Sequence, residues 1–176
     1  MDKAAKMAGF EALLAEKLKL HSWAGEWQDG GLSDDMLRAL FELSCTVTAD
    51  NAGVILETGA GLSTLMFLAS GPSRLITVAP NSDLRDRIYA QIARFSLADQ
   101  QLDFRLGRSE DVLPDLAKSD VPYVDLALID GGHGMPTTTA AEVEDYHKRI
   151  LKWYDDHLKG DLKKKAEEQK AEQPAQ

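Results

Sequence analysis

The residues best suited to chemistry lie in the stretch "VILETGAGLSTLMFLASG", residues 54–71. An apolar run reaches the acid Glu57, two glycines follow at Gly59 and Gly61, and an apolar helical pattern begins directly after them. Glycines at such a turn allow a ligand to approach the backbone closely, because no Cβ stands in the way. The structural alternative is that the two glycines serve only a tight turn, and the residue types alone leave both explanations open.

Two common nucleotide-binding motifs do not fit this turn. The dinucleotide fingerprint G-x-G-x-x-G requires a third glycine where this chain has Thr64. It also expects an acid about 20 residues further on, at the end of the second strand, where the chain reads "VAPNSD". A P-loop needs Gly-Lys followed by Ser or Thr, and the chain lacks that sequence. The pattern therefore disfavours nicotinamide dinucleotides and P-loop ligands.

The elements that must position these residues alternate between strand and helix. The helical segment 62–70 ends at Gly71 and Pro72, and a further helix begins at Ser82. Strand–helix–strand repeats predict right-handed βαβ units, hence an α/β fold with a Rossmann-like parallel sheet flanked by helices. In such a sheet, ligands bind at the carboxyl ends of the strands, where the strand order reverses. Four short segments are predicted as its strands: 53–58, 74–79, 101–106 and 124–130.

Two helices are predicted before the first of these strands. Ser33 precedes Asp34 and Asp35 and is expected to cap the second helix. Between the helices lies the glycine-containing segment "HSWAGEWQDGG", whose Trp23 and Trp27 are expected to be packing anchors. The first helix is indicated by apolar residues at helical spacing: Met7, Phe10, Leu14 and Leu18.

The C-terminal part of the chain departs from the strand–helix alternation. The segment "SEDVLPDLAK" is expected to be a helical turn broken by Pro114, and residues 138–158 are expected to form an amphipathic helix. We therefore divide the chain into an N-terminal helix and linker (1–30), a partial Rossmann-like domain of about four strands (31–158) and a charged tail (159–176). The tail has nothing to bury and is predicted to be disordered.

Composition restricts the possible partners and the compartment. The formal net charge of −9 over 176 residues argues against nucleic acid and anionic membranes as partners, because both are polyanions. Cys45 is the single cysteine and cannot form an internal disulfide, which fits a reducing compartment. Neither a signal peptide nor a membrane span is indicated. We expect a cytoplasmic protein.

Three segments, in this order, resemble motifs of the class I S-adenosylmethionine (SAM)-dependent methyltransferases. "LETGAGLST" (56–64) resembles the family's first motif, an acid followed by x-Gly-x-Gly and a helix. "LGRSEDVLPDL" (106–116) resembles the segment after the third strand, and "VDLALIDGGHGMP" (124–136) resembles the fourth strand with its terminal acid. The resemblance covers roughly residues 31–136 and implies a SAM-binding Rossmann-like fold.

The resemblance also implies the roles of individual residues. Glu57 would orient the glycine loop and meet the amino group of the cofactor, while Ser63 and Thr64 would donate to its carboxylate. Ser109 and Glu110 would lie where the family holds the adenine ring. The implied cofactor-binding set is Glu57, Gly59, Ala60, Gly61, Ser63, Thr64, Asn81, Ser109, Glu110 and Asp130.

Catalytic roles are implied for two residues near the end of the fourth strand. Asp130 would lie beside the methyl group, and Asp130 or His133 would remove a proton from the acceptor. Each of these residues also has a purely structural explanation. Glu57 could serve solely to cap the loop, and His133 could be a turn residue without chemistry. In the same way Ser63 and Thr64 could only cap the helix, and Glu110 could be part of a solvated first turn.

The chain departs from the family in two places. Ala79 and Pro80 replace the acid that usually clamps the ribose, which leaves Asn81 as an uncharged substitute. Strands five to seven of the family have no counterpart after residue 136, which suggests a reading frame truncated or fused there. The fourth strand would then be a sheet edge, with Leu126 and Leu128 on one face and Ala127 and Ile129 on the other. An apolar edge of this kind favours pairing with another chain, hence a possible homo-oligomer.

The resemblance therefore implies a SAM-dependent methyltransferase acting on oxygen or nitrogen of a small-molecule acceptor, without a metal. Two alternatives remain: a catalytically incomplete remnant that binds SAM, and another nucleotide-binding module of the same architecture.

Overall fold

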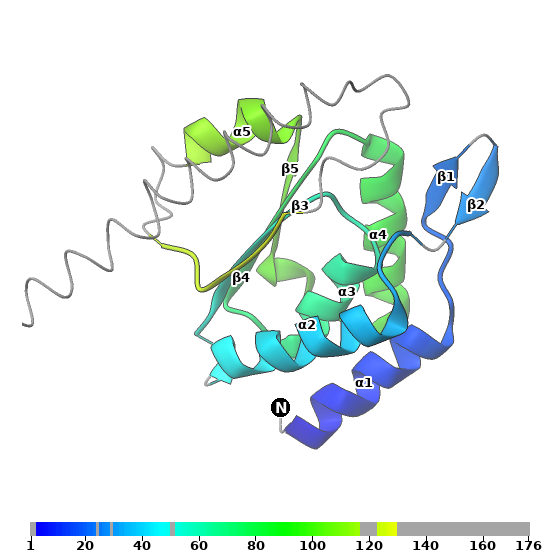
Figure 1. Ribbon diagram of the computed structural model, residues 1–176, viewed down its shortest axis with the longest axis vertical. Coiled ribbons are helices and arrows are strands. Elements are labelled where there is room, and N and C mark those ends of the chain that lie inside the picture. Colours follow the sequence, from blue (N-terminus) through cyan, green and yellow to red (C-terminus); the bar gives the residue numbers. More distant parts are fainter. Residues whose placement is uncertain (1–2, 24, 29, 50–51, 117–122, 130–176) are drawn as a thin grey trace, which may run out of the picture.

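The computed structural model describes residues 3–23, 25–28, 30–49, 52–116 and 123–129. The predicted C-terminal helix 138–158 and the tail 159–176 lie outside these residues. The helices are α1 (Lys3–Ala15), α2 (Asp34–Val47), α3 (Leu62–Ser70), α4 (Ser82–Phe95) and α5 (Ser109–Leu116). The strands are β1 (His21–Trp23), β2 (Glu26–Gln28), β3 (Val54–Thr58), β4 (Arg74–Ala79), β5 (Leu102–Leu106) and β6 (Leu126–Ile129) (Figure 1).

The four predicted strands form one parallel sheet in the order β5-β4-β3-β6. The chain runs outward from β3 through β4 to β5 and then returns to the other side of β3 to form β6. The strand order therefore reverses at β3, which makes the carboxyl end of this strand the topological switch point where ligands bind in such sheets. The predicted Rossmann-like α/β fold is confirmed, and β6 is the edge strand of the described sheet.

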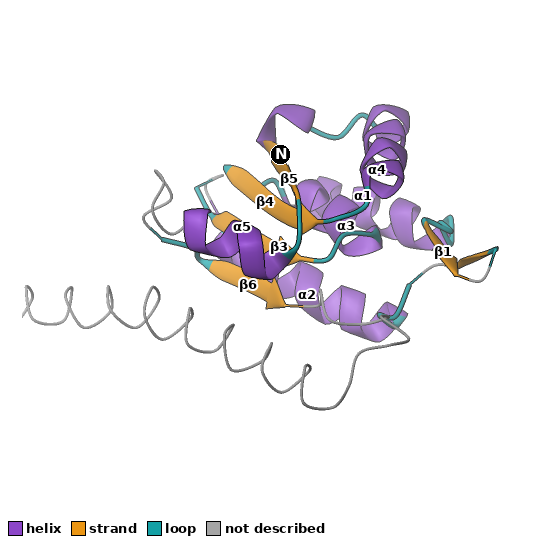
Figure 2. Cartoon of the chain, turned by 90° about the horizontal axis from the view of Figure 1, so that it is seen from above, coloured by secondary structure: helices purple, strands orange, loops and turns teal. Residues whose placement is uncertain are grey.

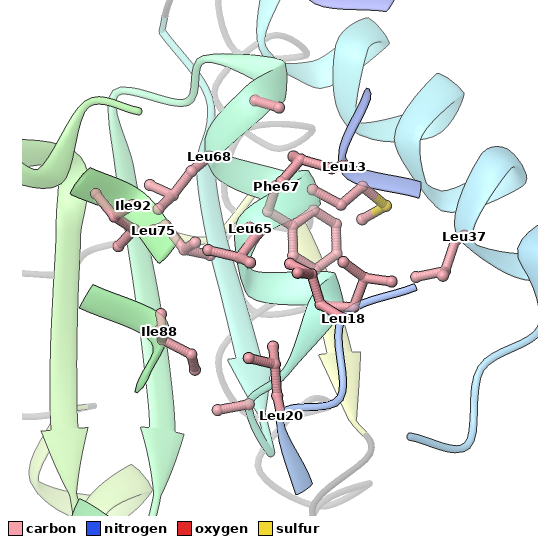
Figure 3. Close-up of a cluster of buried hydrophobic side chains, with 14 of the residues drawn as sticks. Leu13, Leu18, Leu20, Leu37, Leu65, Phe67, Leu68, Leu75, Ile88 and Ile92 are labelled. Atoms are coloured by element: carbon pink, nitrogen blue, oxygen red, sulfur yellow. The ribbon is translucent and has the colours of Figure 1, made fainter. Parts of the chain in front are cut away.

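Helices cover both faces of the sheet, and each face has its own apolar cluster. Figure 2 shows α1 to α4 on one side of the sheet and α5 on the other. The larger cluster joins Ile55 and Leu75 of the sheet to side chains of α1 to α4 (Figure 3). The smaller cluster joins Leu56, Ile76 and Val78 to α5. As predicted, Leu126 and Leu128 face the larger cluster, while Ala127 and Ile129 face the smaller one.

Helix α3 is enclosed on all sides, because all nine of its residues are buried. It lies against the sheet on one side and contacts α1 and α2 on the other. A helix without an exposed polar face is typical of a buried position. Its polar side chains are bonded internally: Ser70 Oγ donates to the carbonyl of Phe67 over 2.7 Å. The helix ends, as predicted, at Gly71, which adopts a left-handed conformation with φ of 74°.

The start of β3 is fixed by a close approach of two backbones. A Cβ built on Gly53 would lie 2.4 Å from the carbonyl oxygen of Val47, in the last turn of α2. Just beyond that turn, Thr48 Oγ1 donates to the carbonyl of Ser70 over 2.9 Å and so ties the end of α2 to the end of α3. Glycine at position 53 therefore allows α2 to pack directly against the entry of β3.

Three sequence-based expectations for helices and the linker were wrong in detail. Helix α1 ends at Ala15, so Leu18 lies beyond it, although Leu18 is buried in the larger cluster. Helix α5 continues through Pro114, because its buried Leu113 and Leu116 keep it packed on the sheet despite the lost N–H. The segment between α1 and α2 is an antiparallel hairpin, β1–β2, rather than an irregular interruption.

The hairpin packs on α4. Trp27 is 42% exposed and its ring faces Arg87 of α4, whose guanidinium carbon lies 3.4 Å from the ring centroid. Trp27 therefore packs on the surface of α4, and a cation–π pair of this kind stabilises the docked hairpin modestly. The side chain of Trp23 lies outside the described part of the structure.

Across the described residues, no helix combines the length and apolarity that a membrane crossing requires.

Candidate functional site

Three strand–helix turns lie next to one another at the carboxyl ends of β3, β4 and β5. The amide of Gly59 donates to the carbonyl of Val78 over 2.9 Å, and the amide of Gly107 donates to the carbonyl of Ala79 over 3.2 Å. These bonds extend the ladder of the sheet by one step beyond the strands. The turns that carry the predicted cofactor-binding residues are therefore held side by side.

Glu57 is the central polar residue of the first turn. Its side chain is 1% exposed, and its carboxylate accepts hydrogen bonds from three hydroxyl groups. Ser63 Oγ donates to Oε2 over 2.9 Å, Thr77 Oγ1 donates to Oε1 over 2.9 Å, and Thr64 Oγ1 also donates to Oε1. A buried carboxylate is tolerated only when its oxygens are bonded in this way.

This arrangement defines what the hydroxyls of Ser63 and Thr64 do in the structure. Each hydroxyl has one proton to give, and both protons go to Glu57. Thr64 Oγ1 additionally accepts from the amide of Gly61 over 3.0 Å. Glu57 thus joins the end of β3 to the first turn of α3 and fixes the loop between them. The predicted contacts of Ser63 and Thr64 with a cofactor stay predictions.

The loop residues between Glu57 and α3 are compact. Gly59 has φ of 89°, in the left-handed region that favours glycine, and Ala60 is buried. The position of a Cβ on Gly61 is taken by the imidazole of His21 from β1, with Nε2 only 2.7 Å away. The group that approaches Gly61 closely in the structure is therefore His21, and the predicted approach of a cofactor to Gly61 stays a prediction.

The second turn, between β4 and α4, carries Asn81. This residue is exposed and is the N-cap of α4, with its side-chain oxygen accepting from the amide of Leu84 over 3.0 Å. The bond uses the oxygen of the amide group, and the side-chain nitrogen carries two N–H donors. A ribose contact from Asn81 stays a prediction that is compatible with the cap.

The third turn, between β5 and α5, carries Ser109 and Glu110. Ser109 is the first residue of α5 and is buried, while Glu110 forms an ion pair with Arg108 at 2.5 Å. Gly107 lies against α5, because a Cβ there would be 2.7 Å from Cγ2 of Val112. The turn is thus close-packed. The structure brings Ser109 and Glu110 to the same sheet edge as Glu57, and their role toward adenine stays a prediction.

Asp130 and His133, the two residues predicted to be catalytic, lie outside the described residues, so their roles also stay predictions. Within the ranges that the structure describes, no group of three or more His, Cys, Asp or Glu side chains could hold a metal ion. The thiol of Cys45 is on α2 in the larger cluster, and burial raises its pKa, so it is a poor nucleophile near neutral pH.

Sequence reasoning missed two residues of the site. Thr77 is paired in register with Glu57 across β3 and β4, and its place as the one polar residue in the apolar run "LITVA" was a signal for it. His21 is distant in sequence, and only the docking of the hairpin brings it to Gly61. The two-residue connection containing Gly25, whose φ is 84°, was a signal for the hairpin itself.

Two solved structures have a similar arrangement. The O-methyltransferase TomG from Streptomyces achromogenes, involved in tomaymycin synthesis and crystallised in complex with SAM, matches with a TM-score of 0.54 at 20% identity. The match covers 87% of this chain and 61% of TomG. A proposed O-methyltransferase from Klebsiella pneumoniae matches with a TM-score of 0.55 at 20% identity, covering 85% of this chain and 60% of that protein.

The likeness shows the fold. The chain has the Rossmann-like fold of the class I SAM-dependent methyltransferases, as the sequence resemblance implied. It spans about three fifths of the length of these two proteins. No protein-family model and no curated protein matches the sequence.

Proposed function

We propose that this chain binds SAM at the carboxyl end of β3 and transfers its methyl group to an oxygen or nitrogen atom of a small molecule. The observation that carries the proposal is the turn between β3 and α3. A buried acid fixes a glycine loop there, at the switch point of the sheet. The same fold is present in TomG, which was crystallised with SAM.

We assign residues of the three turns to the parts of such a cofactor. Gly59, Ala60 and Gly61 would lie against it, Asn81 would meet the ribose, and Ser109 with Glu110 would lie beside the adenine. Three hydroxyls already take most of the acceptor positions of Glu57. Glu57 therefore acts mainly by fixing the loop rather than by direct contact.

The chain's own contribution to methyl transfer is alignment and proton removal. When bound, SAM supplies an electrophilic methyl group on a sulfonium. The rigid β3–α3 turn would hold this group in one orientation toward the acceptor, which lowers the entropic part of the barrier. Asp130 or His133 is proposed to remove the acceptor proton. We propose that the transfer requires no metal ion.

Isothermal titration calorimetry with S-adenosylhomocysteine (SAH) and NAD tests the cofactor assignment. We expect SAH to bind and NAD not to bind. The variant Gly61→Val should weaken SAH binding at least tenfold, because its side chain meets His21 at the loop. Gly9→Val is the matched control, since Gly9 has no neighbour within 4 Å of a built Cβ. Preference for NAD, or equal SAH affinity in Gly61→Val, would contradict the proposal.

A second candidate function is a module that binds SAM without transferring methyl. The observation that favours it is the β3–α3 turn itself, whose polar side chains are bonded to one another and fix a binding loop. Transfer of labelled methyl to a panel of phenols and amines separates the two functions. SAH binding without transfer to any acceptor would favour the second.

We also propose that the edge strand β6 is a surface for self-association, which sedimentation analysis would detect.

A further inference from the structure

The imidazole of His21 lies between two glycines at the candidate site. A Cβ on Gly61 would be 2.7 Å from Nε2, and a Cβ on Gly30 would be 3.4 Å from both Cδ2 and Nε2. The ring therefore fills the space that these two residues leave by having no side chain. His21 is half-buried in this position. Its Nε2 is the ring atom nearest to the glycine loop at the start of α3.

The position of His21 is determined by the hairpin that carries it. His21 is paired with Gln28 across β1 and β2, and Trp27 of β2 is docked on Arg87 of α4. Figure 1 shows the hairpin beside α4 at the end of the sheet where the chain turns from β3 into α3. The hairpin thus holds an imidazole over the loop from outside the βαβ core.

The hydroxyls next to this loop are committed elsewhere. The protons of Ser63 and Thr64 are given to Glu57, whose buried carboxylate needs them. They are therefore poor donors to a second anion unless the Glu57 network is broken. A carboxylate that arrives at Gly61 would gain from a further side-chain donor beside the amides at the start of α3, and the N–H of an imidazole makes a strong hydrogen bond to a carboxylate.

We propose that His21 is a cofactor-binding residue, whose Nε2 donates a hydrogen bond to the carboxylate at the methionine end of SAM. This inference rests on the proposed function, since it assigns a donor within the same site. It replaces the expected donors Ser63 and Thr64 with a residue from the N-terminal hairpin. The hairpin is then part of the cofactor site, and its docking on α4 positions the donor.

Two ligands that differ at the methionine end test the proposal by titration calorimetry. SAH carries the amino-acid carboxylate, whereas 5′-methylthioadenosine has the same adenosine and thioether without it. In His21→Phe, which keeps a ring between the two glycines but has no N–H, SAH should bind about ten- to a hundredfold more weakly. The affinity for 5′-methylthioadenosine should stay within about twofold of that of the unaltered protein.

His21→Gln is the conservative variant, because its amide nitrogen falls near the place of Nε2, and it should restore part of the SAH affinity. Circular dichroism checks that the variants fold. Unchanged or tighter SAH binding in His21→Phe overturns the assignment, as does an equal loss for both ligands, which would mean that His21 only supports the loop. If the unaltered protein binds neither ligand, the proposed function itself fails, which is a different result.

Discussion

The β3–α3 and β4–α4 turns follow neighbouring strands and reach the same edge of the sheet, yet they are built in opposite ways. In the first, Glu57 is buried and shares its carboxylate among three hydroxyls. In the second, Pro80 and Asn81 are exposed and one cap bond starts the helix. A buried charged network must keep its geometry, since every lost partner leaves a buried polar group unbonded. The comparison indicates that the first turn carries the rigidity of the site.

The substitution Glu57→Ala should have the largest effect on stability. It removes the acceptor of three buried hydroxyls and leaves a cavity, so we expect a loss of about 4 kcal/mol in the free energy of unfolding. Urea denaturation followed by circular dichroism measures it. Glu57→Gln keeps the shape and should cost less. A cost for Glu57→Ala no greater than that of an exposed cap would remove the distinction between the two turns.

Alanine at Gly53 should have the next largest effect. Its Cβ would meet the backbone of Val47, which cannot move without shifting α2, so we expect a loss of about 2 to 3 kcal/mol. Gly61→Ala meets only the imidazole of His21, which can rotate, and should cost clearly less. Thermal melting of both variants provides the ranking, with exposed Gly9→Ala in α1 as the control, which should raise stability slightly because alanine favours a helix over glycine. The reverse order would mean that the hairpin, rather than α2, is the rigid neighbour.

Loss of the cap at the second turn should be smaller. Asn81→Ala removes the acceptor for the amide of Leu84 and should cost about 1 kcal/mol. Asn81→Ser retains a cap and should lie close to the unaltered protein. Urea denaturation under the same conditions compares both with Glu57→Ala. A cost near that of Glu57→Ala would show that the exposed turn is as tightly coupled as the buried one.

Asp103 on β5 lies outside both turns, and its carboxylate is bound by arginines rather than by hydroxyl groups. Partial burial by itself raises the pKa of Asp103, but hydrogen bonds from Arg105 and Arg74 outweigh it and hold the pKa below its usual value. A lowered pKa stabilises the fold above the unfolded pKa of about 3.9. That contribution is lost as the pH falls through the lowered value.

The effect of Asp103→Asn should therefore be the smallest. We expect a loss of less than about 1 kcal/mol at pH 6, because the arginines are partly exposed. The difference from the unaltered protein should shrink as the pH falls below about 4. Denaturant titrations at several pH values measure this trend. A difference that stays constant into acid would show that the charge of Asp103 contributes nothing.

The parts of this structure that depend on neighbouring residues in the sequence could be predicted. The four strands, the cap at Ser33 and the end of α3 at Gly71 follow from local patterns, and the structure confirms them. The importance of Glu57 was likewise readable from its place before two glycines. The two faces of β6 followed from strict alternation.

What could not be predicted depends on how distant segments dock. The contact of His21 with Gly61 needs the hairpin to lie against α4, and the contact of Gly53 with Val47 needs the end of α2 to meet the start of β3. The expectation that Pro114 breaks the helix was wrong for a related reason, because packing of α5 on the sheet overrides the local preference against proline. Tertiary contacts decide such cases, and single-sequence patterns do not contain them.

The complete enclosure of α3 has a consequence for hydrogen exchange. Its amide protons are separated from solvent by the sheet and by the layer of α1 and α2. Deuterium can reach them only when that layer departs, an event close to global opening. The exchange rates of α3 would thus report the stability of the whole domain, whereas those of the small β1–β2 hairpin would report its local undocking.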